Sequence, residues 1–448
     1  MKPHALILGD TLAGLVTAWQ LCAADFTVTI LKTNNNLHET PVSPTPPNET
    51  SDPLVLYGPH THTDSLLRDL GISKQESNWK RISVECKTAS STLARFPTPP
   101  LPAPWHTLWG ISTFSALPYR QRWRLLNYLE KVWEGATVLP SSLDLQSAES
   151  WLTSIGQTHP VQKMIWDPLC RFLIGTSLSH TRAGNFTTML TRVFFQSRHH
   201  SPRITSLPQL STLLVKSLLK QLEQQGTTIH RIPAIELLQA GPEQITGVCA
   251  SNGTLYTADS YIAAVHPTTL SSFLPERLLA RYSSFHQISQ TTVTPRMTFN
   301  AISDHTINTP RLILHDGRFS WTLCRPTHTS KGRATLLSCV STGDTDFLSE
   351  TDERIKACAV ETLQNVFPDQ TFLNPELLNR YHIVRQPLGF VPDMPGTELS
   401  RPSNQTPIRN FLLAGSWTDT GASTEMESAI ASGNMCAQTM INQLYTRH

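Results

Sequence analysis

The stretch that organises the chain reads Phe411-Leu-Leu-Ala-Gly-Ser-Trp-Thr-Asp-Thr-Gly421, followed by Ala-Ser-Thr-Glu-Met-Glu-Ser-Ala-Ile-Ala-Ser-Gly433. Its first four residues are apolar and come after a loop rich in Pro and Asn, which predicts a short buried strand. The glycine at 415 then predicts a turn into a helix, capped by Thr420, Ser423 or Thr424. Because a helix N-terminus presents unpaired N–H groups and partial positive charge, this turn suits a phosphate. An ordinary capped helix explains the same residues equally well.

A second glycine motif stands at the start of the chain. Ala5 to Leu8 predicts a buried strand, Gly9-Asp-Thr-Leu-Ala-Gly14 a turn, Leu15 to Ala24 a helix, and Phe26 to Leu31 a second strand. This order is typical of a dinucleotide-binding unit, in which glycines allow a tight turn, backbone approach to the pyrophosphate and close packing. Two residues depart from the pattern. Thr11 takes the place of the middle glycine, and Lys32 stands where a carboxylate usually accepts hydrogen bonds from ribose hydroxyls.

The composition indicates a large globular protein. With 448 residues, 39% of them hydrophobic and 16% charged, the chain can form two domains or one interleaved unit. A net charge of +2 without clustered Lys and Arg argues against nucleic acid. The eight cysteines form no Cys-x-x-Cys pair and the 17 histidines show no ligand spacing, so we expect no metal site and a reducing compartment. No apolar span reaches membrane length and no signal peptide is evident, so we expect a cytoplasmic protein.

Aromatic and basic residues meet in a proline-rich stretch between Phe96 and Pro118. It carries Trp105 and Trp109, and Arg120, Arg122 and Arg124 follow it directly. Rings and cations both suit the headgroup level of a membrane, so peripheral contact with a membrane is one interpretation. A core-packing loop and helix is the other, and the sequence favours it slightly.

The remaining pattern predicts further helices and strands. We expect a loop over 34–53, a strand over 54–57, a capped helix start over 144–152, and an amphipathic helix over 207–225. A strand over 226–235 and a hairpin turning at Asn252-Gly253 come next. Strands over 291–299, 311–315 and 335–340 predict an antiparallel sheet, and 350–367 predicts a helix. We find no repeat and no flexible linker.

The C-terminal stretch resembles a known family. Leu413 to Gly421, with Met426-Glu427 and Ser432-Gly433, looks like the C-terminal flavin-contacting motif of FAD-dependent desaturases and amine oxidases. Its Trp-Thr-Asp-Thr-Gly core is most similar to hydroxysqualene dehydroxylases, the squalene-associated FAD-dependent desaturases. The segments 54–71 and 166–176 resemble further signatures of that family, in the same order along the chain.

The resemblance implies a fold and a cofactor site. The fold is α/β, with a Rossmann-like, glutathione-reductase-like FAD-binding domain (1–85, 205–270 and 405–448) interleaved with an α+β substrate domain (86–204 and 271–404) containing an antiparallel sheet. Backbone around Ile235 would meet the adenine. Ser416 stands where the family usually has an Asp, a third departure. The implied FAD-contacting residues are Gly9, Thr11, Ala13, Gly14, Lys32, Ile235, Gly415, Ser416, Glu425 and Met426.

The implied reaction is reductive dehydroxylation of hydroxysqualene to squalene in hopanoid biosynthesis. Asp419 is the candidate acid for the leaving hydroxyl and Trp417 the candidate wall of the site, and each has a structural alternative, as a turn or cap carboxylate and as a core residue. We expect an apolar tunnel between the cofactor domain and the antiparallel sheet. The segment 166–176 should help to wall the substrate chamber.

Two alternatives stay open. A carotenoid-type desaturase would use the same scaffold to oxidise a polyene. A non-catalytic relative with weakened flavin binding would fit the three departures. Implied partners are a lipophilic isoprenoid, the inner face of the membrane, and the synthases of the squalene precursor.

Overall fold

The computed structural model describes residues 2–33, 55, 60–72, 79–88, 92–135, 143, 145–196, 203–205, 210–241, 243–329, 332–367, 381–391, 394, 401–421 and 425–445. Several predictions lie outside the described residues. They are the loop over 34–53, the strand over 54–57 apart from Val55, and the caps Ser423 and Thr424.

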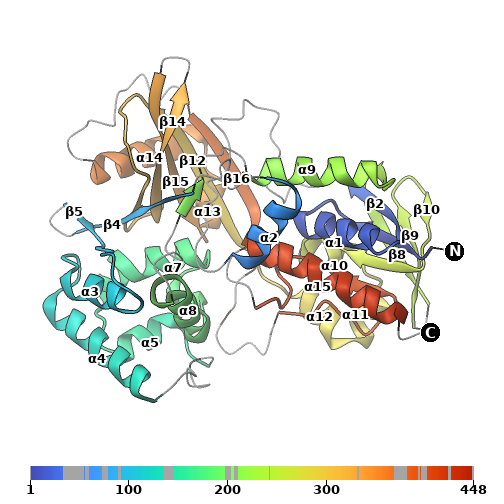
Figure 1. Cartoon of the computed structure of the whole chain (residues 1–448), viewed down its shortest axis with the longest axis horizontal. Helices are drawn as coiled ribbons and strands as arrows, with labels where there is room; N and C mark the ends of the chain where they lie inside the picture. The colour runs from blue at the N-terminus through green and yellow to red at the C-terminus, as the bar shows by residue number, and fades with distance from the viewer. Residues whose placement is uncertain are drawn as a thin grey trace.

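A parallel sheet of five strands forms the unit on the right of Figure 1, in the order β17-β11-β1-β2-β7. All four neighbouring pairs are parallel. Its strands come from three separated parts of the chain, namely β1 (His4–Leu8), β2 (Thr27–Thr33), β7 (Thr228–Ile232), β11 (Ser260–Ala263) and β17 (Phe411–Leu413). The two glycine motifs therefore lie at the same carboxyl edge, because parallel strands all end there.

Different elements cover the two faces of this sheet. One face packs in a single apolar cluster against α1 (Leu12–Ala23), α2 (Thr61–Asp69), α9 (Leu210–Gln224) and α15 (Glu425–Tyr445). The other face packs against a small sheet and three helices, β8 (Ile235–Ala240), β9 (Ile245–Ala250), β10 (Leu255–Tyr256), α10 (Pro267–Phe273), α11 (Glu276–Arg281) and α12 (Ser283–Ser289). The predicted strand over 226–235 is thus two strands, since β7 ends at Ile232 and β8 begins a separate sheet.

Gly433 lets α15 approach α1 closely. A Cβ at Gly433 would lie 2.7 Å from the Ala13 carbonyl oxygen and 2.9 Å from the Val16 Cβ. Across the same contact, the Thr17 hydroxyl donates to the Gly433 carbonyl at 3.2 Å. A glycine at position 433 is therefore needed for the packing of α15 against α1.

A second sheet of seven strands has the order β16-β12-β15-β14-β13-β4-β5. Its neighbours are antiparallel, except that β13 and β4 pair in parallel. Next to it lie α13 (Thr345–Leu348) and α14 (Asp352–Val366), the latter close to the predicted 350–367. The strands are β4 (Ser83–Lys87), β5 (Leu93–Arg95), β12 (Thr294–Ser303), β13 (Arg311–Leu314), β14 (Trp321–Thr329), β15 (Gly332–Thr342) and β16 (Tyr381–Phe390).

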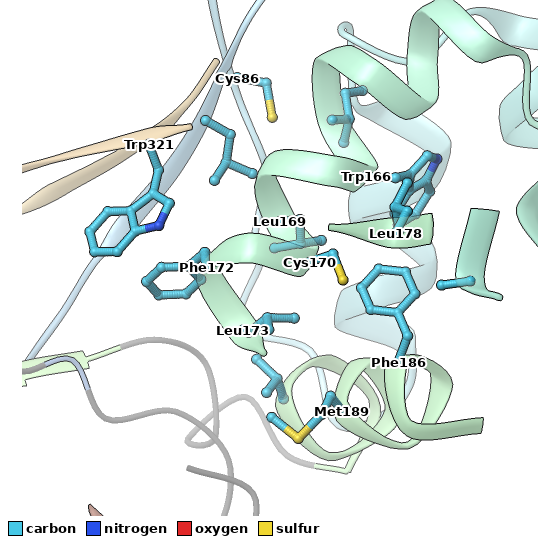
Figure 2. Close-up of a cluster of buried hydrophobic side chains, with 14 of the residues drawn as sticks. Cys86, Trp166, Leu169, Cys170, Phe172, Leu173, Leu178, Phe186, Met189 and Trp321 are labelled. Carbon is cyan, nitrogen blue, oxygen red and sulfur yellow. The ribbon is translucent and has the colours of Figure 1, made fainter. Parts of the chain in front are cut away.

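A helical segment completes the molecule, below the second sheet in Figure 1. Its residues pack with those of β4, β13 and β14 in one apolar cluster. Figure 2 shows the join, where Phe172 of α7 meets Trp321 of β14 with ring centroids 5.3 Å apart. The elements are β3 (Trp79–Arg81), which pairs with β6 (Arg203–Thr205), then α3 (Trp105–Thr113), α4 (Tyr119–Gly135), α5 (Ala148–Ser154), α6 (His159–Val161), the π-helix η2 (Gln162–Trp166), α7 (Asp167–Leu173), the 3-10 helix η3 (Leu178–His180), α8 (Ala183–Leu190) and the π-helix η4 (Thr191–Phe195).

Candidate active site

The first glycine turn is built by close packing at the carboxyl edge of the parallel sheet. The Gly9 N–H donates to the Leu31 carbonyl at 2.9 Å, and Gly9 has φ +103°. A Cβ there would lie 2.3 Å from the Ala264 carbonyl oxygen. A Cβ at Gly14 would lie 2.8 Å from the Gly9 carbonyl oxygen. Both positions therefore require glycine, and Ala13 is buried beside them.

Thr11 acts as the N-cap of α1. Its hydroxyl accepts a hydrogen bond from the Gly14 N–H at 3.0 Å, and the residue is 8% exposed. The threonine in the middle position thus satisfies one of the N–H groups at this helix N-terminus itself, and the helix begins at Leu12, earlier than predicted.

Lys32 lies at the end of β2 and forms an ion pair with Asp10, the residue after the first glycine. The side chain of Asp10 is 12% exposed and that of Lys32 is 39% exposed. The end of β2 therefore lacks the usual carboxylate, but Asp10, which follows β1, places a carboxylate beside Lys32. Sequence patterns did not identify Asp10, because its pairing becomes visible only when the two strand ends are placed side by side.

Trp417 closes over the second glycine turn. Its indole N–H donates to the Val265 carbonyl at 3.1 Å, and a Cβ at Gly415 would lie 2.3 Å from the same nitrogen. Trp417 is buried in the apolar cluster on one face of the sheet. The half-buried Ser416 accepts hydrogen bonds at its carbonyl from Arg401 Nη1 at 2.9 Å and from the Ser428 hydroxyl at 3.0 Å.

A buried polar network ties this turn to α15, and sequence reasoning missed its centre. Asn404 donates through Nδ2 to the Leu413 carbonyl at 2.6 Å and to Ser432 Oγ at 3.1 Å. The Ser432 hydroxyl accepts from the Gly415 N–H at 2.9 Å and lies 2.7 Å from the Thr418 hydroxyl. A buried Asn that is hydrogen-bonded to Leu413 and Ser432 fixes the strand, the turn and the helix together. The signal in the sequence that could have indicated this network is Asn404, a polar residue shortly before the strand β17.

The other predicted residues of the C-terminal stretch fall in different environments. Asp419 is exposed, and its N–H donates to the Pro402 carbonyl at 2.9 Å. Glu425 is exposed at the start of α15, and Met426 is buried in the cluster with α1. Ile235 is half-buried at the start of β8. The roles of these four residues stay predictions.

Glu427, one turn into α15, holds the start of α2. Its carboxylate accepts from the His62 N–H at 2.8 Å and the Thr63 N–H at 2.9 Å, and His60 Nδ1 lies 3.8 Å away. Burial raises the pKa of Glu427, but the His60 ring, the Thr63 hydroxyl and these N–H groups outweigh it and lower the pKa to about 2. Glu427 is therefore a carboxylate at neutral pH and serves as the cap of a distant helix.

An apolar cavity of about 120 Å³ lies within the helical segment. Helices α3, α4, α7 and α8 and η4 contribute most of the lining, and β4 and β13 contribute Val84, Cys86 and Leu314. Four lining residues carry hydroxyls, and each hydroxyl is hydrogen-bonded within the protein; that of Tyr128 accepts from the Trp151 indole N–H at 3.1 Å. Thr187 donates to the Ala183 carbonyl, Thr191 to the Thr187 carbonyl, and Thr107 to the Phe194 carbonyl. The walls are therefore hydrocarbon in character.

The cavity differs from the predicted tunnel in its position. It lies between helices and one end of the seven-stranded sheet, rather than between the two sheets. Trp166 and Leu169, from the predicted wall segment, line it. η4 connects it to the second glycine turn, because Thr191 and Phe194 line the cavity while Arg192 Nη1 donates to the Gly421 carbonyl at 2.6 Å.

Three tryptophans of α3 and α4 are exposed, whereas Phe114 between these helices is buried. Trp105 and Trp109 are 62% and 55% exposed and lie one turn apart on α3, and Trp123 is 57% exposed on α4. Two of the arginines bind backbone, since Arg122 donates to the Leu117 carbonyl and Arg124 to the Gly156 carbonyl. Over the part of the chain that the structure describes, no helix has the length and hydropathy to cross a bilayer.

Comparisons with known proteins bear on these features. A family model described as flavin containing amine oxidoreductase matches residues 53–441. A zeta-carotene desaturase of Synechocystis is 27% identical over 69% of this chain and 68% of its own length. A 15-cis-phytoene desaturase of an Oncidium hybrid is 23% identical over 98% of this chain and 74% of its own length.

Solved structures show the same fold. Cyclohexylamine oxidase of Brevibacterium oxydans has a TM-score of 0.70 at 13% identity, with 99% of this chain and 100% of that chain covered. An oxidoreductase of Methanosarcina mazei has a TM-score of 0.68 at 14% identity, with 98% and 100% covered. The predicted fold class is confirmed. The domain boundaries stay a prediction.

The residues at the carboxyl edge fit a dinucleotide cofactor. Gly9 supplies a turn that a side chain would block, and α1 directs its N-terminus toward that edge. Gly415 supplies a second turn two strands away, and Asp10 supplies a carboxylate at the end where the usual acceptor is missing. In the described residues we find no group of His, Cys, Asp and Glu side chains arranged to hold a metal ion.

Proposed function

The chain belongs to the family of flavin-containing amine oxidoreductases, and on this premise we propose that it is a desaturase of a long isoprenoid, of the carotenoid type. FAD is its cofactor. The apolar cavity carries the proposal, because its lining selects hydrocarbon and its volume of about 120 Å³ accommodates one section of an isoprenoid chain. The names of its relatives, which include zeta-carotene and phytoene desaturases, support the same substrate class.

The lining argues against a small amine as substrate. A protonated amine taken out of water needs a carboxylate at its charge, because cation–π contact with aromatic rings contributes only about 0.5–2 kcal/mol. Among the residues that the structure describes, the cavity lining contains no carboxylate; it consists of aliphatic and aromatic side chains, Cys86, and the hydroxyl residues that are already hydrogen-bonded within the protein. A protonated amine would lose its hydration without a carboxylate to pair with, whereas an isoprenoid chain would gain about 25 cal/mol for each Å² buried.

FAD, when bound, takes up hydride in desaturation or gives hydride when it is reduced. The residues of the chain have other tasks. Gly9, Thr11 and α1 hold the dinucleotide half, Trp417 and Ser416 shape the turn near the reacting end, and the cavity excludes water from the substrate.

A second candidate reaction is the reductive dehydroxylation of hydroxysqualene. The stretch Trp417-Thr-Asp-Thr-Gly421 favours it, because it is most similar to that family. This reaction needs an acid for the leaving hydroxyl, and Asp419 remains its candidate. With it we keep the proposal that the protein contacts the synthases of the squalene precursor.

We also propose that the protein works on the inner face of a cytoplasmic membrane. Trp105, Trp109 and Trp123 expose rings on α3 and α4, the helices whose inner faces line the cavity. Exposed indoles prefer the headgroup region. Flotation with liposomes should weaken when Trp105 and Trp109 both become Ala, and should not change in Leu255→Ala, which alters an exposed residue on β10. Equal flotation of all three proteins would remove the membrane proposal.

Product analysis separates the two reactions. The purified protein is incubated with FAD and a quinone acceptor on phytoene or zeta-carotene, and with FAD and a reductant on hydroxysqualene. Lengthened conjugation supports the desaturase, and squalene supports the second candidate. Turnover of neither substrate would contradict both.

A variant tests the cavity itself. Leu129→Trp should fill it and lower turnover of the long substrate while flavin content stays the same. Asn127→Trp, which adds the same side chain to an exposed position of α4, is the matched control. Equal activity of both variants would place the substrate elsewhere.

A further inference from the structure

Asp10 and Lys32 stand at the ends of neighbouring parallel strands. In the pairing of β1 with β2, Leu8 lies opposite Leu31, and the Gly9 N–H donates to the Leu31 carbonyl at 2.9 Å. Asp10 and Lys32 are the next residues on each side, and their side chains form an ion pair. Both side chains therefore share the place where a dinucleotide fold meets the adenosine ribose.

In most dinucleotide-binding folds one carboxylate at the end of the second strand accepts the hydrogen bonds of the ribose, and here Asp10 and Lys32 together take its place. Ribose hydroxyls donate hydrogen bonds to a carboxylate, and the Lys32 ammonium has no acceptor to offer. A carboxylate has two oxygens with about four acceptor positions, so it can accept from ribose hydroxyls while it is paired with an ammonium such as that of Lys32. Its side chain is 12% exposed, and a shielded charged acceptor binds more strongly than an exposed one.

Lys32 also removes an electrostatic conflict. A carboxylate directly after Gly9 lies in the loop that approaches the pyrophosphate, and two like charges at short range repel each other. The Lys32 ammonium neutralises the Asp10 carboxylate, so the pair as a whole carries no net charge. This explains why an acidic residue is compatible with the phosphate loop of this chain.

We propose that Asp10, positioned by Lys32, accepts the hydrogen bonds of the adenosine ribose of FAD. The acceptor for the ribose has thus moved from the end of β2 to the loop after β1, while the lysine on β2 became its counter-ion. The inference rests on FAD as the cofactor and adds a specificity-determining residue. It also predicts that Lys32→Glu, which restores the usual pattern, weakens FAD binding, because it would set two carboxylates side by side.

Binding measurements with the flavin-depleted protein test the proposal. The probes are FAD and an FAD analogue whose adenosine lacks both ribose hydroxyls, each titrated while flavin fluorescence is followed. For the parent, the analogue should bind about tenfold to a hundredfold more weakly than FAD, the factor of a hydrogen bond to a charged group. The Asp10→Asn variant should bind FAD more weakly than the parent by a similar factor. Its affinity for the analogue should be nearly the same as its affinity for FAD.

Variants of Lys32 complete the test. Lys32→Glu should weaken FAD binding, and the exchange Asp10→Lys with Lys32→Glu should restore it to within a few-fold of the parent, because the pair is reversed and one carboxylate remains. Circular dichroism and melting curves establish that each variant is folded.

Two outcomes would overturn the proposal. If Asp10→Asn keeps the full penalty for the analogue, the ion pair only fixes the loop. If Lys32→Glu alone tightens FAD binding, the acceptor belongs on β2. A folded parent protein that binds neither FAD nor the analogue would instead contradict the assignment of FAD as cofactor, and with it the proposed function. That result is distinct from the two outcomes above.

Discussion

Replacing Glu427 by Gln should loosen the start of α2 by a measurable amount. The Glu427 carboxylate accepts the N–H groups of His62 and Thr63, and its pKa is lowered from 4.5 to about 2. This lowering of the pKa corresponds to about 3 kcal/mol of stability. Because the folded pKa lies below the unfolded one, this stability is present above pH 4.5 and is lost as the pH falls toward 2.

Hydrogen exchange followed by mass spectrometry can measure the effect on residues 60–72. At neutral pH, the amides of α2 should exchange about a hundredfold faster in Glu427→Gln than in the parent, since about 3 kcal/mol of local stability is removed. The difference should shrink as the pH falls from 4.5 toward 2. Glu425→Gln, an exposed residue of the same helical turn, is the control and should change exchange little. Equal protection of α2 in Glu427→Gln and the parent at neutral pH would refute the reasoning.

Two further predictions concern the turn after β17. Trp417→Phe removes the indole donor and leaves the Val265 carbonyl without that partner. The free energy of unfolding, measured in urea, should therefore fall by about 1–3 kcal/mol. An unchanged free energy of unfolding would show that this hydrogen bond does not stabilise the fold. Asp419→Asn should lower turnover of hydroxysqualene while flavin content and Tm stay constant; if activity persists, the acid is another residue or a water molecule.

Local patterns in the sequence predicted the elements that depend on local chemistry. The two glycine motifs gave the strand ends at Gly9 and Gly415, and alternating apolar residues gave the strands of the second sheet. The helix α14 and the turn at Gly253, where φ is +81°, also agree with their predictions. In each of these cases the residues that decide the structure are close together in the chain.

The missed features join residues that are far apart in the chain. Glu427 belongs to the C-terminal motif in the sequence, yet it caps α2, more than 360 residues earlier. Lys32 departs from the dinucleotide-binding pattern in the sequence, and its partner Asp10 cannot be recognised there because it follows a different strand. The apolar character of the cavity depends on where threonine hydroxyls point, which no sequence period reveals. Such pairings are set by tertiary packing.

The most direct test of the central claim is the spectrum of the flavin during a single reaction step. The protein with FAD is held without oxygen, phytoene or zeta-carotene is added, and the visible absorbance of the flavin is followed. The proposed desaturase predicts bleaching, because hydride from the substrate reduces the flavin, together with a product of longer conjugation. An oxidised spectrum that stays unchanged with each of these isoprenoids, in protein that carries FAD, would contradict the claim.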